Sequence, residues 1–334
     1  CISCHSFNGM HQVSGKGSDL RPTDFESEVS CESCHANDGN GGWSHEIAGV
    51  RGEPDRHMAK VSCQACHIPT YGNSHTETHR MWTLHLDGTP ANCSEADPCP
   101  AHPYHDSNTE PLVPAYKFWN RMSDNYLLGD VATVNPDTGN TYQTSMPQGD
   151  IAEGNGKLYP FKYKTSEAPI STDGKIIAVD TWEYLKGTGD ITTSVNKGVA
   201  NMRAEGITVG DFDHWGTSDT YQLITHGITP AASITGCDQC HGAWDIDNDN
   251  MLDAMGYKLK GAKFDVCNQC HDGDKKLART HERMHGHIDK GSGIGCAFCH
   301  SFERPARPGC QDPCAPCASE FVDNVPYPDD NCGN

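Results

Sequence analysis

Apolar residues occur in short runs throughout this chain, and few of these runs keep a regular period. They make up 35% of the 334 positions, and the mean hydropathy is -0.64. The longest apolar stretches, such as Lys175–Val179, have the length of a strand, whereas a membrane span needs roughly 18 residues. We therefore expect no membrane span and only a small core made of protein side chains.

Two neighbouring segments in the middle of the chain have the composition of β-strands. They are Leu158–Lys164 and Lys175–Tyr184, and Asp173 and Gly174 between them form a turn signal. The pattern predicts a small β-hairpin at this place.

One segment has the spacing of an amphipathic helix. Within Ser194–Glu205, the side chains of Val195, Val199 and Met202 fall on one helical face. Other stretches of the same region, including Asn135–Gly156, are rich in turn-forming residues and predict irregular structure.

A repeated Cys-x-x-Cys-His motif is the strongest pattern in the chain, and it occurs six times. Random placement of the same residues would give about 0.05 copies, so the repeat is not a result of composition. The motif is typical of covalent haem c attachment, in which two thiols bond the porphyrin and the adjacent histidine binds the iron. Zinc pairs, redox dithiols and disulfides are the alternatives, but zinc would not need a histidine at the fifth position every time. The predicted attachment cysteines are Cys1, Cys4, Cys31, Cys34, Cys63, Cys66, Cys237, Cys240, Cys267, Cys270, Cys296 and Cys299, and the predicted proximal histidines are His5, His35, His67, His241, His271 and His300.

Six haems would supply the apolar mass that the protein lacks, at about one haem per 56 residues. Iron and thioether bonds would then cross-link segments of the chain and stabilise the fold, as metals do in other folds with small cores. We therefore predict a mostly irregular, loop-rich fold with short α-helices around a haem array, and one small β-hairpin in the central insert. Without its haems the chain should not fold.

The spacing of the motifs divides the chain into four parts. Three closely spaced motifs predict an N-terminal tri-haem block at 1–86, and three more predict a C-terminal block at 226–304. Residues 87–225 form a motif-free insert with the predicted hairpin and a disulfide loop. Residues 305–334 form a cysteine-rich tail.

Thirteen further histidines could bind the second axial position of the irons, where six are needed. Position relative to the motifs ranks six of them first as distal ligands: His11, His45, His57, His226, His285 and His287. His75, His79, His85 and His281 are reserves, and His102 and His105 beside Pro103 are less available.

The remaining six cysteines agree with an oxidising compartment. Disulfide candidates are Cys93 and Cys99 around a short loop, and Cys310, Cys314, Cys317 and Cys332 in the tail. Cys314 and Cys317 have haem spacing, but Ala318 replaces the histidine. Because haem c is attached outside the cytoplasm, we expect a secreted protein, periplasmic or extracellular, whose signal peptide has been removed.

Acidic residues give the chain a formal net charge of -20. Such a surface disfavours nucleic acid and favours basic or cationic partners. Alternating aspartates at Asp245, Asp247, Asp249 and Asp253 resemble part of a calcium loop, with Asn250 and Gly256 where an EF-hand has Gly and Glu. A calcium site and four solvated acids both remain open.

Several segments resemble the octahaem tetrathionate-reductase-type cytochromes c. The matching segments are His57–Tyr71, Val113–Asn120, Leu158–Lys164, Gln222–Lys258 and Cys296–Arg307. This resemblance implies a multihaem fold and, for catalysis, a haem with a lysine as distal ligand, for which Lys16 is the early candidate. The chain departs from the family in carrying six motifs instead of eight.

We predict a secreted hexahaem cytochrome c that relays electrons through closely spaced bis-His haems, with no catalytic residue. Its partners would be other redox proteins or extracellular electron acceptors. A motif at Cys1 would leave a terminal haem near the surface, so a head-to-tail homopolymer, or filament, with haems stacked between subunits is a further expectation. The alternative is an enzyme, a multihaem reductase of sulfur or nitrogen oxyanions with one open or lysine-ligated haem.

Overall fold

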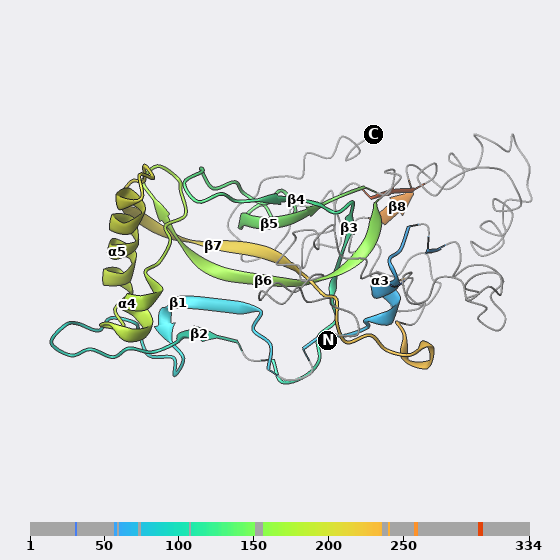
Figure 1. Ribbon diagram of the computed structural model, residues 1–334, viewed down its shortest axis with the longest axis horizontal. Coiled ribbons are helices and arrows are strands. Elements are labelled where there is room, and N and C mark those ends of the chain that lie inside the picture. Colours follow the sequence, from blue (N-terminus) through green and yellow to red (C-terminus); the bar gives the residue numbers. More distant parts are fainter. Residues whose placement is uncertain are drawn as a thin grey trace, which may run out of the picture.

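A mixed β-sheet organises the chain (Figure 1). The computed structural model describes residues 31, 57–58, 60–72, 75–106, 108–150, 156–235, 240, 257–259 and 300–302. Among these residues, seven strands form one sheet, ordered β2-β1-β6-β7-β5-β4, with β3 also paired to β6. The strands are β1 (His79–His85), β2 (Pro103–His105), β3 (Ala115–Trp119), β4 (Met122–Asn125), β5 (Tyr142–Gln148), β6 (Lys157–Ser171) and β7 (Phe212–Leu223).

The central strand of the sheet is β6, which is 15 residues long. One of its edges pairs antiparallel with β7, from Phe161 opposite Leu223 onwards. Its other edge is shared by two strands: β3 pairs antiparallel with the first residues of β6, and β1 pairs in parallel at Thr165 and Ser166. The same strand therefore runs from one end of the sheet to the other and connects both ends.

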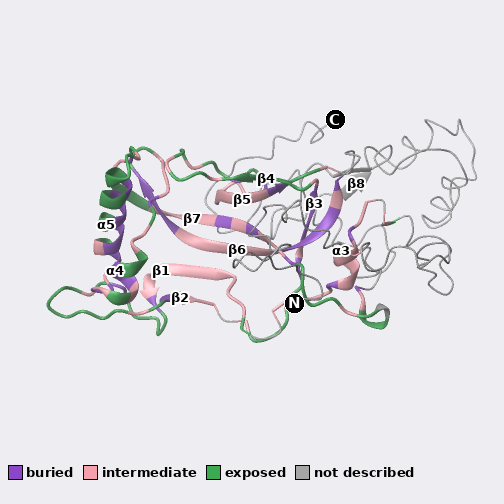
Figure 2. Cartoon of the chain, in the orientation of Figure 1, coloured by how far each residue is buried: buried purple, intermediate pink, exposed green. Residues whose placement is uncertain are grey.

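Two helices, α4 (Thr181–Lys186) and α5 (Ile191–Ala204), lie at one end of the sheet (Figure 1). An aspartate caps each helix, because the Asp180 carboxylate accepts from the Glu183 amide and the Asp190 carboxylate from the Thr193 amide. Figure 2 shows buried residues along the inner side of α5. The core at this end consists of Ala91, Ile177, Tyr184, Ile191, Val195, Val199, Met202 and Val209.

The helix predicted at Ser194–Glu205 is confirmed, and its three marker residues Val195, Val199 and Met202 are all buried. It begins a few residues earlier than expected, at Ile191, after the Asp190 cap.

The predicted fold class is wrong, because a seven-stranded sheet replaces the expected loop-rich array with short helices and one small hairpin. The strands carry many polar residues, as in the Thr165–Glu167 stretch of β6 and the Thr217–Thr220 stretch of β7. Such strands show no alternation of apolar and polar residues. They form because partners far apart in the sequence complete their hydrogen bonds, which a local pattern does not reveal.

Two local predictions also fail. Leu158–Lys164 is part of β6, but the second predicted strand, Lys175–Tyr184, contains only isolated bridges at Lys175 and Ile176 and then enters α4. The Asp180 cap with Glu183 three residues later is a helix-start signal that overrides the strand composition. The stretch Asn135–Gly156, predicted to be irregular, contains β5.

Shorter elements lie outside the large sheet. They are α3 (Cys63–His67), the 3-10 turn η1 (Ala231–Ser233) and a two-stranded antiparallel sheet of β8 (Tyr257–Leu259) and β9 (His300–Phe302). In the latter, the backbone of His300 pairs with Leu259. Within the described ranges, none of the helices has the length and hydropathy of a membrane span.

Candidate haem-binding site

The third haem motif forms the short helix α3. Ser62 caps it, with its hydroxyl accepting from the Ala65 amide, and the fully buried Ile68 follows its last residue. Cys63 and Cys66 are three positions apart on this helix, so their side chains leave the same face. The motif residues thus have the local arrangement that two bonds to one porphyrin require.

The imidazole of His67 is oriented by a backbone carbonyl from a distant segment. Its Nδ1 lies 2.9 Å from the Thr229 carbonyl oxygen, and an imidazole nitrogen at this distance donates its hydrogen to the carbonyl. That bond places the proton on Nδ1 and leaves Nε2 with its lone pair for iron. Proximal histidines are commonly fixed in this way, so the residues present fit a haem.

Residues 229–235 hold α3 through further bonds. The Thr229 amide donates to the His67 carbonyl and the Thr235 amide to the Cys66 carbonyl, both at 2.8 Å. The Thr235 hydroxyl donates to the Ala65 carbonyl at 3.2 Å. The segment that leads into the fourth motif, Cys237-x-x-Cys240-His241, therefore anchors the third.

Cysteines of three motifs gather around the β3–β6 pair. Burial raises the pKa of Tyr159 on β6, and the Cys31 and Cys63 sulfurs, within electrostatic range, raise it further. Burial likewise raises the pKa of Tyr116 on β3 to about 12, with contributions from the sulfurs of Cys240 and Cys66. Thioether formation would remove these thiolate charges and leave apolar sulfur beside the tyrosines. Cys31 and Cys240, one cysteine each of the second and fourth motifs, thus lie within electrostatic range of the same two strands as the cysteines of the third.

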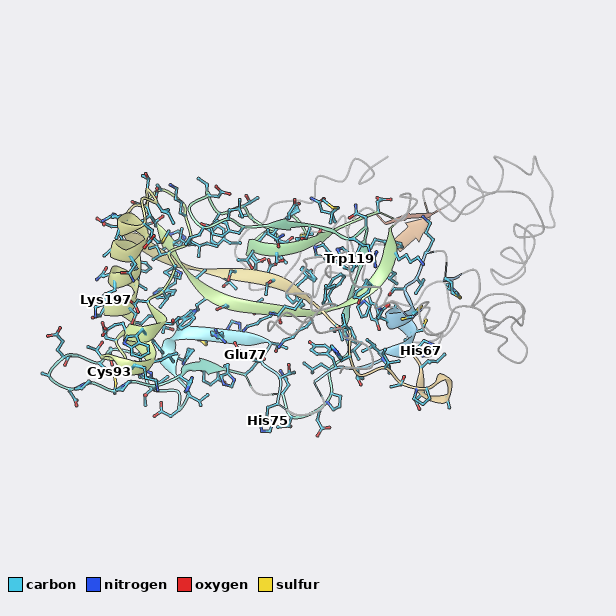
Figure 3. All side chains as sticks on the ribbon, viewed as in Figure 1. His67, His75, Glu77, Cys93, Trp119 and Lys197 are labelled. Atoms are coloured by element: carbon cyan, nitrogen blue, oxygen red, sulfur yellow. A yellow bond between two sulfur atoms is a disulfide. The ribbon has the colours of Figure 1, made fainter. Side chains whose placement is uncertain are left out.

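An aromatic cluster lies next to these cysteines. Trp119, Tyr159, Phe161 and Tyr221 are buried, and successive ring centroids are 5.1 to 6.0 Å apart. Tyr163 extends the row at 5.0 Å from Tyr221. Such rings supply apolar surface that suits a porphyrin face. Figure 3 shows Trp119 and His67 at the same end of the molecule.

Two of the six first-ranked distal candidates lie in the described residues, and both are exposed. His57 precedes α3, and its carbonyl accepts from the Lys60 and Val61 amides. His226 follows β7, and its Nδ1 lies 3.0 Å from the Thr225 hydroxyl. His57 lies just before the third motif in the sequence, and His226 lies three residues before Thr229, which contacts that motif. Their role as distal ligands stays a prediction.

The reserve histidines His75, His79 and His85 and the less available His102 and His105 lie within the described residues. His79 Nδ1 lies 2.7 Å from the Thr165 hydroxyl, and His85 is buried. His75 and His102 are exposed, and the His105 ring bonds the Asp106 carbonyl at 3.2 Å.

Cys93 and Cys99 are joined by a disulfide, with Cα atoms 5.8 Å apart. Many other candidates lie outside the described residues: Cys1, Cys4, His5, His11, Lys16, Cys34, His35, His45, Cys237, His241, Asp245, Asp247, Asp249, Asp253, Cys267, Cys270, His271, His281, His285, His287, Cys296, Cys299, Cys310, Cys314, Cys317 and Cys332.

Sequence reasoning missed Thr229, Thr235 and Tyr116 as supports of the site. Thr229 orients the His67 ring through its backbone carbonyl, which carries no residue-specific signal, although its hydroxyl also donates to the His67 carbonyl at 3.2 Å. The available hint was the resemblance to a known family, because Gln222–Lys258 contains both threonines and Val113–Asn120 contains Tyr116.

Comparisons with known proteins support the haem assignment. Residues 106–244 match the family described as bacterial cytochrome c, and residues 229–276 match a doubled CXXCH motif. No match is found among curated proteins. A solved octahaem cytochrome c from Shewanella oneidensis shares the fold, with a TM-score of 0.54 and 22% identity over 72% of this chain. The match spans 54% of that protein, about half its length. These similarities agree with the six Cys-x-x-Cys-His motifs and support a relationship to multihaem cytochromes c.

Proposed function

We propose that this chain is a hexahaem electron relay that works outside the cytoplasm, with bis-His haems close enough for electrons to pass between them. The observation that carries the proposal is the contact between the third motif and the segment that leads into the fourth: the His67 Nδ1 lies 2.9 Å from the Thr229 carbonyl oxygen, and the Thr235 amide donates to the Cys66 carbonyl. Haem c supplies one-electron chemistry when bound. Two attachment sites on contacting segments would favour transfer between their haems.

The protein residues would set how readily each haem gives up an electron. The Thr229 carbonyl would hold His67 in one ring orientation as an iron ligand, because it accepts the Nδ1 hydrogen. Buried aromatic rings beside the cysteines lower the local dielectric constant and keep water away. Saturated axial positions would leave no open iron for a substrate, so the partners would be redox proteins or extracellular acceptors that exchange electrons only.

Haem count and ligation are tested together. Intact-mass measurement of the denatured protein should show six covalent haem masses, and fewer would contradict the hexahaem reading. Replacing His57 or His226 by Ala should convert one low-spin haem to high spin while the covalent haem count stays unchanged. His214→Ala, at an exposed position on β7, is the matched control and should leave the spin state unaltered.

The reductase alternative requires an open or lysine-ligated iron. Ferric spectra with and without cyanide or nitrite count such irons directly, and we expect no change with either ligand. Steady-state reduction of tetrathionate, nitrite or hydroxylamine at the rates of dedicated reductases would favour the enzyme instead.

We also propose that copies of the chain assemble head to tail into a homopolymer. Exposed haem edges would favour burial between copies. Size-exclusion chromatography and electron microscopy of the unsheared protein should then show filaments, and a monodisperse monomer at high concentration would leave a discrete shuttle.

A further inference from the structure

His85 lies against the disulfide at the helix-covered end of the sheet. It is the last residue of β1 and is 3% exposed. Its Nε2 is 3.4 Å from the Cys93 sulfur and 3.6 Å from the Cys99 sulfur. The three atoms all lie within 4.8 Å of one another. In Figure 3, Cys93 lies at the opposite end of the sheet from His67, so this cluster is separate from the third haem motif.

The other nitrogen of the His85 ring is unusual. Nδ1 is buried and has no hydrogen-bond partner within the described part of the chain. The buried ring thus has one nitrogen without a partner, which is unfavourable by about 1–3 kcal/mol, while its other nitrogen, Nε2, faces the two sulfurs. One imidazole nitrogen and two cysteine sulfurs belong to the ligand types that zinc prefers.

We propose that the Cys93–Cys99 disulfide is reducible and that its dithiol form binds a zinc ion together with His85. A dithiol reductant supplies two electrons and two protons, the sulfur–sulfur bond breaks, and two thiols form while the reductant becomes a disulfide. Zinc then displaces both thiol protons and binds two thiolates and His85 Nε2. The fourth position of the tetrahedron is open to water, as in zinc sites that are not purely structural.

Backbone contacts would keep the ligands in place after reduction. The Cys99 amide donates to the Thr188 carbonyl at 2.8 Å, and the Ala91 amide donates to the Thr83 carbonyl at 2.9 Å. Gly189, with φ of +78°, allows this approach, because a Cβ there would lie 2.2 Å from the Cys99 carbonyl oxygen. Both ends of the cysteine loop are thus held independently of the disulfide, and the site would be largely preorganised.

Access and charge also suit the cation. Cys99 is exposed and Cys93 partly exposed, so a reductant can reach the sulfurs. Three acidic residues on this loop and the preceding turn, Asp87, Glu95 and Asp97, are exposed nearby in sequence and add negative potential.

The test uses the complete holoprotein with its haems. The protein is reduced with a phosphine, desalted without oxygen, incubated with or without zinc chloride and alkylated with iodoacetamide. Peptide mass spectrometry should show that zinc protects Cys93 and Cys99. His85→Gln should weaken zinc binding by about 10–100-fold or more and abolish protection at matched zinc, whereas His214→Gln should retain it.

Zinc-edge X-ray absorption provides a second readout that the haem irons do not obscure. The spectrum should show two sulfur ligands at about 2.3 Å and nitrogen or oxygen at about 2.0–2.1 Å, with one sulfur lost in Cys99→Ser. Cysteines that resist the phosphine, equal alkylation with and without zinc, or unchanged protection in His85→Gln would each overturn the proposal.

Discussion

The end of the sheet that carries α4 and α5 is packed with protein side chains, whereas the end beside α3 carries the haem motifs. At the first end, eight buried residues form a continuous core, and both helices have their own aspartate caps. At the second end, a five-residue helix is held by a few bonds from residues 229–235. The difference teaches that protein side chains supply the core at the first end, whereas at the second end the short helix depends on bonds from a distant segment and lies where haem would add apolar surface.

Removing a haem should have the largest effect, and only at the α3 end. In Cys63→Ala with Cys66→Ala, intact mass should fall by one haem. The unfolding free energy should fall by several kcal/mol, because covalent and iron bonds that link segments are lost. Hydrogen exchange should rise in α3 and residues 229–235 while α5 stays protected. Equal loss of protection in α5 would show that the two ends are not independent.

A cavity in the protein core should destabilise the end of the sheet that carries α4 and α5 and leave the haem-motif end unchanged. Ile177 is 1% exposed and belongs to the core under α5. Ile177→Ala should lower the unfolding free energy by about 2–5 kcal/mol, measured by denaturant titration, while the haem absorption spectrum of the native protein stays unchanged. Val131→Ala, at a side chain that is 63% exposed, is the control and should have little effect.

Gly198 tests how closely α5 packs on the chain before α4. A Cβ at this position would lie 2.1 Å from the Ala178 carbonyl oxygen. Alanine gains about 1 kcal/mol in helix propensity over glycine, but overpacking against backbone is unfavourable by about 1–3 kcal/mol. Gly198→Ala should therefore lower the melting temperature. An increase would show that α5 can move away from Ala178 without destabilising the fold.

The smallest expected effect concerns pH at the helix-covered end. The Lys197 ammonium, followed by the Thr188 hydroxyl and amide, lowers the pKa of Glu183 from 4.5 to about 2. A lowered carboxyl pKa stabilises the fold above pH 4.5, and this contribution is lost as the pH falls toward 2. The melting-temperature difference between wild type and Glu183→Gln should therefore shrink between about pH 6 and about pH 3. A constant difference would contradict the assigned role, and the exposure of Lys197 keeps the effect small.

Sequence reasoning was strongest where chemistry and local spacing coincide. The Cys-x-x-Cys-His motifs identified the cofactor, and the period of Val195, Val199 and Met202 located α5. It failed for the sheet, because β5 and β7 are polar strands stabilised by partners distant in the chain. The orientation of His67 by Thr229 could not be predicted from the sequence either, since 162 positions separate the two residues and the bond uses a main-chain oxygen.

The long strand β6 has a consequence for the order in which the protein is assembled. In a chain that emerges amino end first, α3 appears well before β6, and β6 must then wait for β7 before its second edge is paired. Pairs so distant in sequence close slowly, and until they close, α3 lacks the bonds from residues 229–235 that hold it in the native fold. His67 gains its Thr229 carbonyl only after β7 has been made. Haem attachment at this motif can therefore precede the sheet, and the sheet then fixes the proximal histidine in its final orientation.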